Sequence, residues 1–434
     1  MGSIAGLERF DSPGKGRALR VTRPFKVGEL LYSTPAYTFV LSLNERGFNC
    51  EFCFTRKEKL ARCGKCKKAF YCNVKCQVGC KDWAMHKLEC SAMIAFKENW
   101  CPSEISRLVA RILAKKKTKK ERCASEKILR IDEIQSHVED VDNEKREMHE
   151  ADVFGLHRFF SKHLKLPDHK DLLTLFSQVA CNGFTIEDDE LSNMGTAIYP
   201  DVALINHSCC PSVIVTNKGT SAEVRAVQNM KPGDEVLISY IDVLYPTDDL
   251  NNRLRETYYF TCDCRDCKNK SKDKEKLKVR KRSDPIEPEV ISNMVRYARK
   301  TIREFRAVKH TKNILSELLE MCEQSLEEMG AVFDEANVYM LHVMYQAMGV
   351  CLYMEDPEGA LTYGEKIIKH YSKLYPPFSL NVSSMYLKLG RLYMGLERRS
   401  AGVSAFKKAM AIMEVAHGKD HFYLTELCKE MAQK

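Results

Sequence analysis

The sequence lacks any long hydrophobic run. Apolar residues make up 44% of its 434 positions, but no apolar stretch approaches the roughly 18 residues that a membrane-spanning helix needs. The opening MGSIAGLERF has no apolar core, so we expect no secretory signal, and Gly6 stands where a myristoylation signal needs Ser or Thr. The sequence therefore predicts a protein of the cytoplasm and nucleus, with two or three domains and no membrane partner.

Cysteine, in contrast, is abundant, at 19 residues. In a reducing compartment, clustered cysteines indicate metal ligands or catalysis rather than disulfides. The net charge of +9 permits binding to acidic partners. Two basic runs, KKKTKKER (115–122) and KVRKRS (278–283), are typical of solvated helix faces or linkers, with nuclear import or nucleic-acid binding as the alternative.

The order of local patterns predicts a multi-domain α+β protein. Residues 14–33 show short β-prone runs cut by Gly and Pro, residues 100–180 have helical periodicity, and residues 181–245 return to a strand pattern. Everything beyond residue 288 is helical in period. There MYQAMG (344–349) and MYLKLG (385–390) repeat at a spacing of 41 residues, which favours stacked helix pairs similar to tetratricopeptide repeats over two helices that are alike by chance.

Metal-ligand spacing dominates the segment from Cys50 to Cys90. Its pairs read C-x2-C, C-x2-C, C-x3-C and H-x3-C, and the eight side chains suffice for two tetrahedral zinc ions. We expect them to interleave, with Cys50, Cys53, Cys72 and Cys76 on one ion and Cys63, Cys66, His86 and Cys90 on the other. Cys80 is the alternative to Cys76 as a ligand of the first ion.

A second cysteine group, CDCRDC (262–267), supplies three thiolates through Cys262, Cys264 and Cys267 and needs a fourth. The stretch DVALINHSCCPSVIV (201–215) offers Cys209 and Cys210, of which we favour Cys209 as the ligand of a third zinc ion. Cys210 is then a packed thiol.

Several motifs together resemble known families. AFYCNVKCQ and DWAMHKLEC resemble the MYND zinc finger, a protein-interaction module that takes proline-rich peptides. GKGR (14–17), NHSCCP (206–211), DEVLISY (234–240) and CDCRDC resemble the SET domain of protein-lysine methyltransferases with its post-SET zinc site. A finger within a SET domain, followed by a helical domain, is typical of the SMYD family. CNGFTIEDDELS (181–192) and EVAHGKDH (414–421) are similar to one branch of it, the second vertebrate paralogue.

The resemblance implies a pseudo-knotted, β-rich SET domain with an inserted MYND finger and a helical insert, followed by an all-α domain similar to tetratricopeptide repeats. The implied order is residues 1–49 for the N-terminal part of the SET domain, 50–90 for the finger, 91–180 for a helical linker and insert, 181–245 for the SET core, 246–272 for the post-SET zinc site and 273–434 for the helical domain.

The resemblance also implies transfer of a methyl group from S-adenosylmethionine to lysines of histone and non-histone proteins, with a role in chromatin and transcription regulation. Such in-line transfer needs a neutral amine, correct alignment and exclusion of water, but no nucleophile from the enzyme. Tyr240 would orient the amine, and Phe184, Tyr240 and Tyr258 would line the lysine channel. The cofactor would contact Lys15, Gly16, Arg17, His137, Asn182, Asn206, His207, Tyr258, Tyr259 and Phe260.

The expected partners are protein substrates with an accessible lysine, proline-rich peptides on the finger and a heat-shock chaperone on the helical domain, and the chain is expected to be a monomer. Two alternatives compete with the enzyme. One is a non-catalytic scaffold in which the finger and the helices recruit partner proteins. The other is nucleic-acid binding by the basic finger, an accessory role whose affinity would fall steeply with salt.

Overall fold

The computed structural model describes residues 3–78, 83–118, 121–307 and 314–432. The chain divides into two compact units. The first consists of Met1–Asn206, Ser212–Ile238 and Glu256–Tyr259, and the second of His207–Pro211, Ser239–Arg255 and Phe260–Lys434. Among the described residues, no helix combines the length and the apolar character that crossing a membrane requires.

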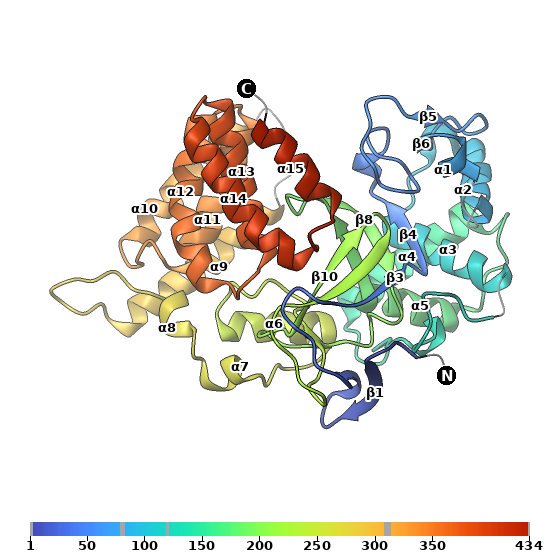
Figure 1. The fold of residues 1–434 in the computed structure, drawn as a ribbon, viewed down its shortest axis with the longest axis horizontal. Coiled ribbons are helices and arrows are strands. Elements are labelled where there is room, and N and C mark those ends of the chain that lie inside the picture. Colours follow the sequence, from blue (N-terminus) through green and yellow to red (C-terminus); the bar gives the residue numbers. More distant parts are fainter. Residues whose placement is uncertain (1–2, 79–82, 119–120, 308–313, 433–434) are drawn as a thin grey trace. The chain divides into compact units, whose positions relative to one another are not determined.

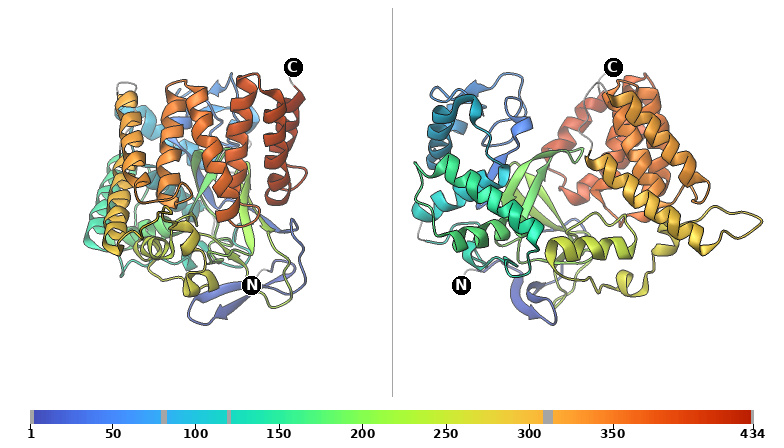
Figure 2. Two further views of the ribbon diagram at one scale, coloured as in Figure 1. Left: turned by 90° about the vertical axis from the view of Figure 1, so that its left-hand side faces the viewer. Right: turned by 180° about the vertical axis from the view of Figure 1, so that it is seen from behind.

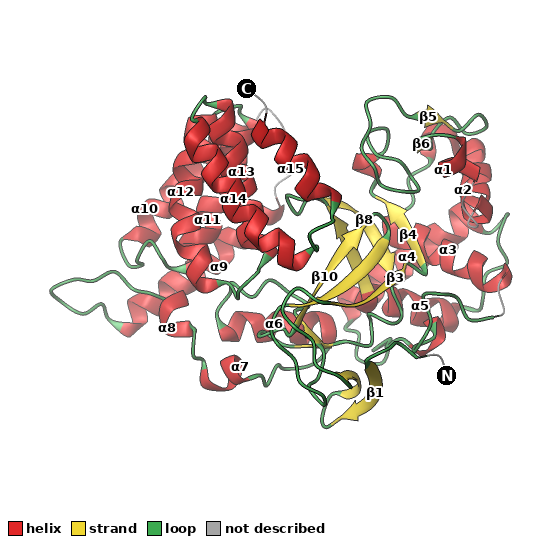
Figure 3. Ribbon diagram, viewed as in Figure 1, coloured by secondary structure: helices red, strands yellow, loops and turns green. Residues whose placement is uncertain are grey.

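The first unit combines small antiparallel sheets with helices (Figure 3). Its strands are β1 (Leu7–Ser12), β2 (Gly16–Val21), β3 (Leu30–Pro35), β4 (Thr38–Leu41), β5 (Ala61–Arg62), β6 (Phe70–Tyr71), β7 (Gly183–Glu187), β8 (Asn193–Ile198), β9 (Asn206–His207), β10 (Val213–Lys218), β11 (Ser221–Ala226) and β12 (Leu237–Ile238). Its helices are α1 (Val74–Val78), α2 (Trp83–Phe96), α3 (Glu104–Thr118), α4 (Asn143–Phe160) and α5 (His169–Asn182), with short 3-10 turns at Leu43–Glu45, Lys97–Asn99 and Ile131–Glu133.

Two three-stranded sheets, in the spatial orders β10-β11-β3 and β4-β8-β7, form the centre of this unit. The predicted N-terminal strands form the β1–β2 hairpin, in which Ser12 pairs with Gly16. In the second sheet Gly195 is required by close packing, because a Cβ atom there would lie 2.2 Å from the backbone oxygen of Val40. β9 pairs with β12, and its second residue, His207, begins a segment of the second unit.

A row of cations on α3 covers the free edge of β4. Arg107, Arg111 and Lys115 recur every fourth residue, and each donates a side-chain hydrogen bond to a backbone oxygen of the strand segment, namely those of Leu41, Phe39 and Tyr37. The match is geometric, because four helical residues advance about 6 Å and two strand residues about 6.6 Å. The helix thus satisfies the edge that would otherwise be open to another strand.

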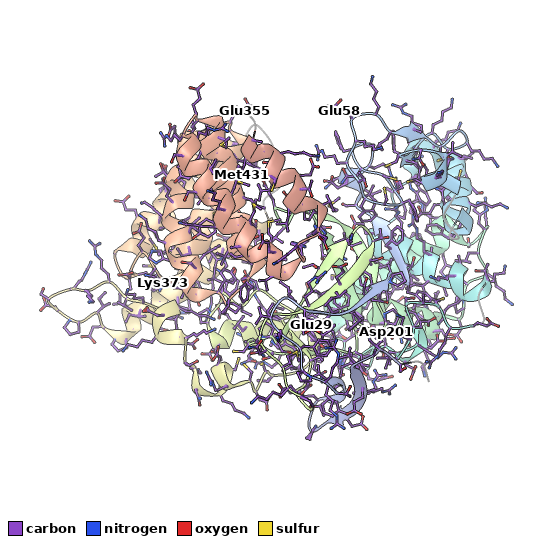
Figure 4. All side chains as sticks on the ribbon, viewed as in Figure 1. Glu29, Glu58, Asp201, Glu355, Lys373 and Met431 are labelled. Carbon is purple, nitrogen blue, oxygen red and sulfur yellow. The ribbon has the colours of Figure 1, made fainter. Side chains whose placement is uncertain are left out.

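A buried carboxylate anchors the first part of the insert between α3 and α4 to the β-rich part. Asp201 is fully buried, and its oxygens accept backbone N–H groups of Lys127, Ile128 and Leu129 at 2.7–2.9 Å. Figure 4 labels this side chain. A buried carboxylate with three donors sets the path of the irregular segment that leads to His137.

The second unit contains the helices that follow residue 260, and the left view of Figure 2 shows the later ones side by side. They are α7 (Arg265–Asn269), α8 (Asp273–Lys276), α9 (Pro288–Ala307), α10 (Leu315–Gly330), α11 (Val338–Tyr353), α12 (Pro357–Leu374), α13 (Leu380–Gly395), α14 (Arg399–Ala416) and α15 (Phe422–Ala432). α6 (Thr247–Tyr258) begins in this unit, and its last residues belong to the first.

The repeated motifs occupy equivalent helices. MYQAMG lies in α11 and MYLKLG in α13, and each is followed by an antiparallel partner, α12 or α14 (Figure 1). The ends are set by local signals: Asn337 and Asp356 cap the N-termini of α11 and α12 through side-chain oxygens that accept backbone N–H groups. The predicted helical C-terminal region is confirmed.

Candidate functional site

Three groups of cysteine and histidine side chains converge in the described residues, and in each group the four ligand atoms lie within 4.8 Å of one another. Two groups fall in the finger and the third in the second unit, so the prediction of three zinc clusters in these places is confirmed. The groups are Cys50, Cys53, Cys72 and Cys76; Cys63, Cys66, His86 and Cys90; and Cys209, Cys262, Cys264 and Cys267.

The spacing of these atoms fits tetrahedral zinc. Four thiolates at the usual Zn–S distance lie about 3.8 Å apart. The sulfurs of Cys53 and Cys72 are 3.6 Å apart, those of Cys63 and Cys90 are 3.9 Å apart, and Cys209 lies 3.9 Å from Cys262. These separations are far beyond a disulfide bond, whose sulfurs are about 2 Å apart. Zinc in each group would tie together segments that are distant in the sequence.

The neighbours Cys209 and Cys210 have different environments. Cys209 is buried and belongs to the third group. Cys210 is exposed, so the prediction of a packed thiol is wrong, and its sulfur lies 2.9 Å from Oδ2 of Asp266. The structure thus groups Cys209 with the CDCRDC thiols. Cys80, the alternative ligand of the first group, lies outside the described residues.

In the first unit, Glu235 links the N-terminal hairpin to Asn206. Asn206 donates from Nδ2 to one carboxylate oxygen of Glu235 at 3.0 Å, and Ser12 donates from its hydroxyl to the other at 3.1 Å. Ser12 pairs with Gly16 in the β1–β2 register, so the turn that carries Lys15 and Gly16 is held near Asn206. Glu235 lies within the motif DEVLISY, but the sequence alone did not predict that it links these two segments.

Arg17 connects the same hairpin to the helical insert. Its guanidinium donates to the backbone oxygen of Glu133, and burial lowers the pKa of Arg17, with Arg9 nearby acting in the same direction. Asn182 meets the insert from the other side, because its Nδ2 donates to the backbone oxygens of Gln135 and Gln178 at 2.8 Å. The Asn182 amide nitrogen is therefore engaged with the insert and with its own helix.

His137 and Tyr259 face each other in strained conformations. Both have left-handed backbones, with φ of 51° and 62°, which cost non-glycine residues about 1–3 kcal/mol each. Their ring centroids are 5.2 Å apart, and the ammonium of Lys145 lies 5.2 Å from the Tyr259 ring centroid. Strain of this kind clusters at ligand sites, so the pairing of these two predicted cofactor residues is consistent with such a site.

Phe184 and Tyr258 are the two predicted channel residues of the first unit. Phe184 packs edge-on against Tyr199 at 5.8 Å, and Tyr199 is fixed because its hydroxyl donates to the backbone oxygen of Thr220. Burial raises the pKa of Tyr258, so its phenol stays neutral at physiological pH. Both side chains therefore offer uncharged aromatic surface.

In the second unit, three predicted site residues form an aromatic group beside the third cluster. The centroids of His207 and Tyr240 are 5.2 Å apart, those of His207 and Phe260 are 5.7 Å apart, and those of Tyr240 and Phe260 are 6.1 Å apart. The backbone N–H of Tyr240 donates to Nδ1 of His207 at 3.0 Å. This group brings together residues 207, 240 and 260, which are far apart in the sequence.

Ser212 directly follows the NHSCCP motif. Its hydroxyl donates to the backbone oxygen of Glu235 at 3.2 Å and accepts the N–H of Leu237 at 2.9 Å. The buried serine therefore connects the turn after Pro211 to the segment of residues 235–237 through both of its hydroxyl contacts.

Comparisons with known proteins agree with this geometry. The family model of the MYND finger matches residues 50–90. The chain is 64% identical to the N-lysine methyltransferase SMYD2 of Homo sapiens over 428 residues, which cover 99% of this chain and 98% of the relative. It is 63% identical to N-lysine methyltransferase SMYD2-B of Xenopus laevis, over 99% of this chain and all of the relative.

A relative from Gallus gallus, also an N-lysine methyltransferase SMYD2, is 64% identical over 98% of this chain and 97% of its own length. Identity of this extent includes the finger, the β-rich part and the helices together. The predicted family is confirmed: the chain belongs to the SMYD family of N-lysine methyltransferases.

Proposed function

We propose that this chain transfers methyl groups from S-adenosylmethionine to lysine side chains of histone and non-histone proteins, and so acts in chromatin and transcription regulation. The observation that carries the proposal is the position of Tyr240, whose backbone bonds to His207 and whose ring packs against Phe260. Full-length similarity to N-lysine methyltransferases supports the same reaction.

The residues of the first unit suit a zwitterionic cofactor. No hydrogen bond or ion pair of the Lys15 ammonium is found within the described ranges, so it can meet a carboxylate. Asn206 is oriented by Glu235; with its Nδ2 so engaged, its oxygen can accept a hydrogen bond from an ammonium group. Tyr258 and Tyr259 supply aromatic surface. When bound, S-adenosylmethionine would supply an electrophilic methyl group on its sulfonium sulfur. The rest of the molecule would leave as a neutral thioether.

The enzyme's own task is then to deliver a neutral lysine amine in line. The hydroxyl of Tyr240 orients the nitrogen lone pair. Desolvation of the amine favours loss of the ammonium proton, because it disfavours the charged form. As the nitrogen–carbon bond forms, the carbon–sulfur bond breaks and sulfur takes its electron pair. Alignment and desolvation supply the rate enhancement.

The finger and the helices serve recruitment in this proposal. Phe48 and Val74 expose more than half of their surface near the first cluster, and Arg56 lies over the Phe48 ring at 5.6 Å. Such apolar and cationic surface suits a proline-rich peptide. We further propose a monomer in the cytoplasm and nucleus, with the helical domain as the site for a heat-shock chaperone.

Methyl transfer tests the proposal directly. Zinc-loaded protein is incubated with tritium-labelled S-adenosylmethionine and a panel of histones and lysine peptides. We expect labelled lysine with the native chain and at least a 100-fold loss in Tyr240→Phe, a size typical for a lost catalytic contact. Tyr363→Phe, which removes an exposed hydroxyl of α12, is the matched control and should keep full activity. No transfer by the native chain to any substrate would favour the non-catalytic scaffold.

A further inference from the structure

His207 lies between the third metal cluster and Tyr240. The side chain is buried, with 4% of its surface exposed. Nδ1 accepts the backbone N–H of Tyr240 at 3.0 Å, and Nε2 lies 3.5 Å from the sulfur of Cys209. One imidazole ring thus touches both a metal-ligand thiol and the residue proposed to orient the target amine.

These contacts fix which nitrogen carries the proton. A neutral imidazole has one N–H, and Nδ1 can accept the N–H of Tyr240 only if that nitrogen is unprotonated. The proton is therefore on Nε2, which faces Cys209. A zinc-bound thiolate is a good acceptor for such a donor, and four thiolates around one Zn²⁺ carry excess negative charge that an N–H donor stabilises.

Two aromatic rings pack against the imidazole of His207. The Tyr240 and Phe260 rings lie 5.2 and 5.7 Å from that of His207. Phe260 precedes Cys262 by two residues, and the backbone N–H of Cys262 is bound by Oδ1 of Asn251 at 2.8 Å. A flip of the imidazole would break the contacts of both ring nitrogens at once, because Nδ1 faces the Tyr240 N–H and Nε2 faces the Cys209 sulfur.

We propose that His207 is a positioning residue that couples the third cluster to Tyr240: its Nε2–H stabilises the Cys209 thiolate while its Nδ1 fixes the Tyr240 backbone. Only the consequence for methyl transfer rests on the proposed function. The coupling itself is a property of the fold, and it can be measured without any substrate.

Two substitutions separate the two contacts. In His207→Asn the side-chain oxygen falls near the place of Nδ1 and can still accept the Tyr240 N–H, but nothing reaches Cys209. In His207→Gln the amide nitrogen falls near the place of Nε2 and can donate to Cys209, but the acceptor for Tyr240 is lost. Cys210→Ser is the matched control, because it changes the neighbouring thiol outside the third group. Cys264→Ser removes one ligand of the third group and so shows which phase of zinc release belongs to the third ion.

Two rates are measured on the full zinc-loaded chain: release of the third zinc ion to a chelator, and hydrogen exchange of the Tyr240 amide. We expect His207→Asn to release zinc about 10- to 100-fold faster, the usual size of an outer-shell effect, with the Tyr240 amide still protected. His207→Gln should hold zinc like the native chain and lose protection at Tyr240. The coupling would be overturned if neither variant changed either rate. It would also be overturned if zinc release and Tyr240 amide exchange changed equally in His207→Asn and His207→Gln.

Activity adds a separate readout. At saturating S-adenosylmethionine, His207→Gln should lower kcat about 10-fold or more, because Tyr240 loses the acceptor that fixes its backbone, whereas Cys210→Ser should not. If the native chain transfers no methyl group, the proposed function fails while zinc release and amide exchange still decide the coupling.

Discussion

The finger of residues 50–90 and the helices between residues 288 and 432 are held by different interactions. The finger has two-residue strands and a five-residue helix before α2, and eight of its side chains converge in two groups of potential metal ligands. The helices instead bury apolar side chains, as where Leu387, Phe406 and Met413 pack with Leu424 and Leu427. Stability is therefore concentrated on a few ligand atoms in one region and distributed over many contacts in the other.

Removing zinc should show the largest difference between the two regions. Structural zinc contributes on the order of 10 kcal/mol or more per ion to a small module. After chelation we expect the amides of residues 50–72 to lose protection in hydrogen exchange followed by mass spectrometry, whereas those of α11 and α13 stay protected. A metal-free protein whose finger amides remain protected would contradict this picture.

A buried ion network is the second support of the finger region. Glu89 of α2 is fully buried and accepts from Arg107 at 3.2 Å and Arg111 at 2.8 Å. Burial opposes its ionisation, but the two guanidiniums outweigh this and hold the pKa of Glu89 far below its usual range.

Glu89→Gln should lower the free energy of unfolding by about 3–5 kcal/mol, because two buried cations lose the carboxylate that bridges them, and Glu51, 3.6 Å from Arg107, is the remaining acidic partner. Glu8→Gln is the control, since it breaks the exposed pair with Arg20 and should cost at most about 1 kcal/mol. Denaturant unfolding of both variants measures the contrast, and equal losses would show that burial is not the deciding factor.

The sequence predicted the zinc clusters and the repeated helices well, because the residue patterns that indicate them are local. The ligand pairs at short spacing and the 41-residue repeat need no knowledge of distant packing. Glu89, Glu235 and Asp201 could not be assigned in this way, because a carboxylate surrounded by donors from segments 18 to 223 residues away looks like any surface acid in the sequence. The fourth ligand of CDCRDC, a choice between Cys209 and Cys210, likewise depended on which thiol the fold buries.

The two repeat motifs offer a smaller test within the helices. Gly390 of α13 and Gly349 of α11 occupy the same motif position. A Cβ atom on Gly390 would lie 2.4 Å from the Phe406 ring, whereas nothing lies within 4 Å of one on Gly349. Gly390→Ala should therefore cost about 1–3 kcal/mol through overpacking. Gly349→Ala should be neutral or stabilise by up to about 1 kcal/mol, because alanine favours helix. Thermal unfolding of the two variants side by side checks the prediction, and equal effects would contradict it.

The smallest expected effect concerns acid sensitivity in the helices. The ring of His342 in α11 stacks on the Tyr245 ring at a centroid distance of 3.9 Å. The guanidinium groups of Arg253 and Arg306 also lie over the Tyr245 ring. Burial and then the two arginines lower the pKa of His342 to about 3. The unfolded chain binds a proton near pH 6.5 and the folded chain does not, so this stability is complete above pH 6.5 and falls toward pH 3.

Each pH unit below about 6 should thus remove up to about 1.4 kcal/mol from the free energy of unfolding. His342→Phe keeps an aromatic ring in the stack but cannot be protonated, so it should lose less stability than the native chain between pH 7.5 and 5.5. The urea midpoint for exchange of α11 amides reports this difference locally, and the exposed His163→Gln serves as the control. Acid also protonates the zinc thiolates, so the test compares the two variants rather than the absolute loss of stability. If the stability of the native chain and that of His342→Phe fall equally with pH, the acid sensitivity does not come from His342.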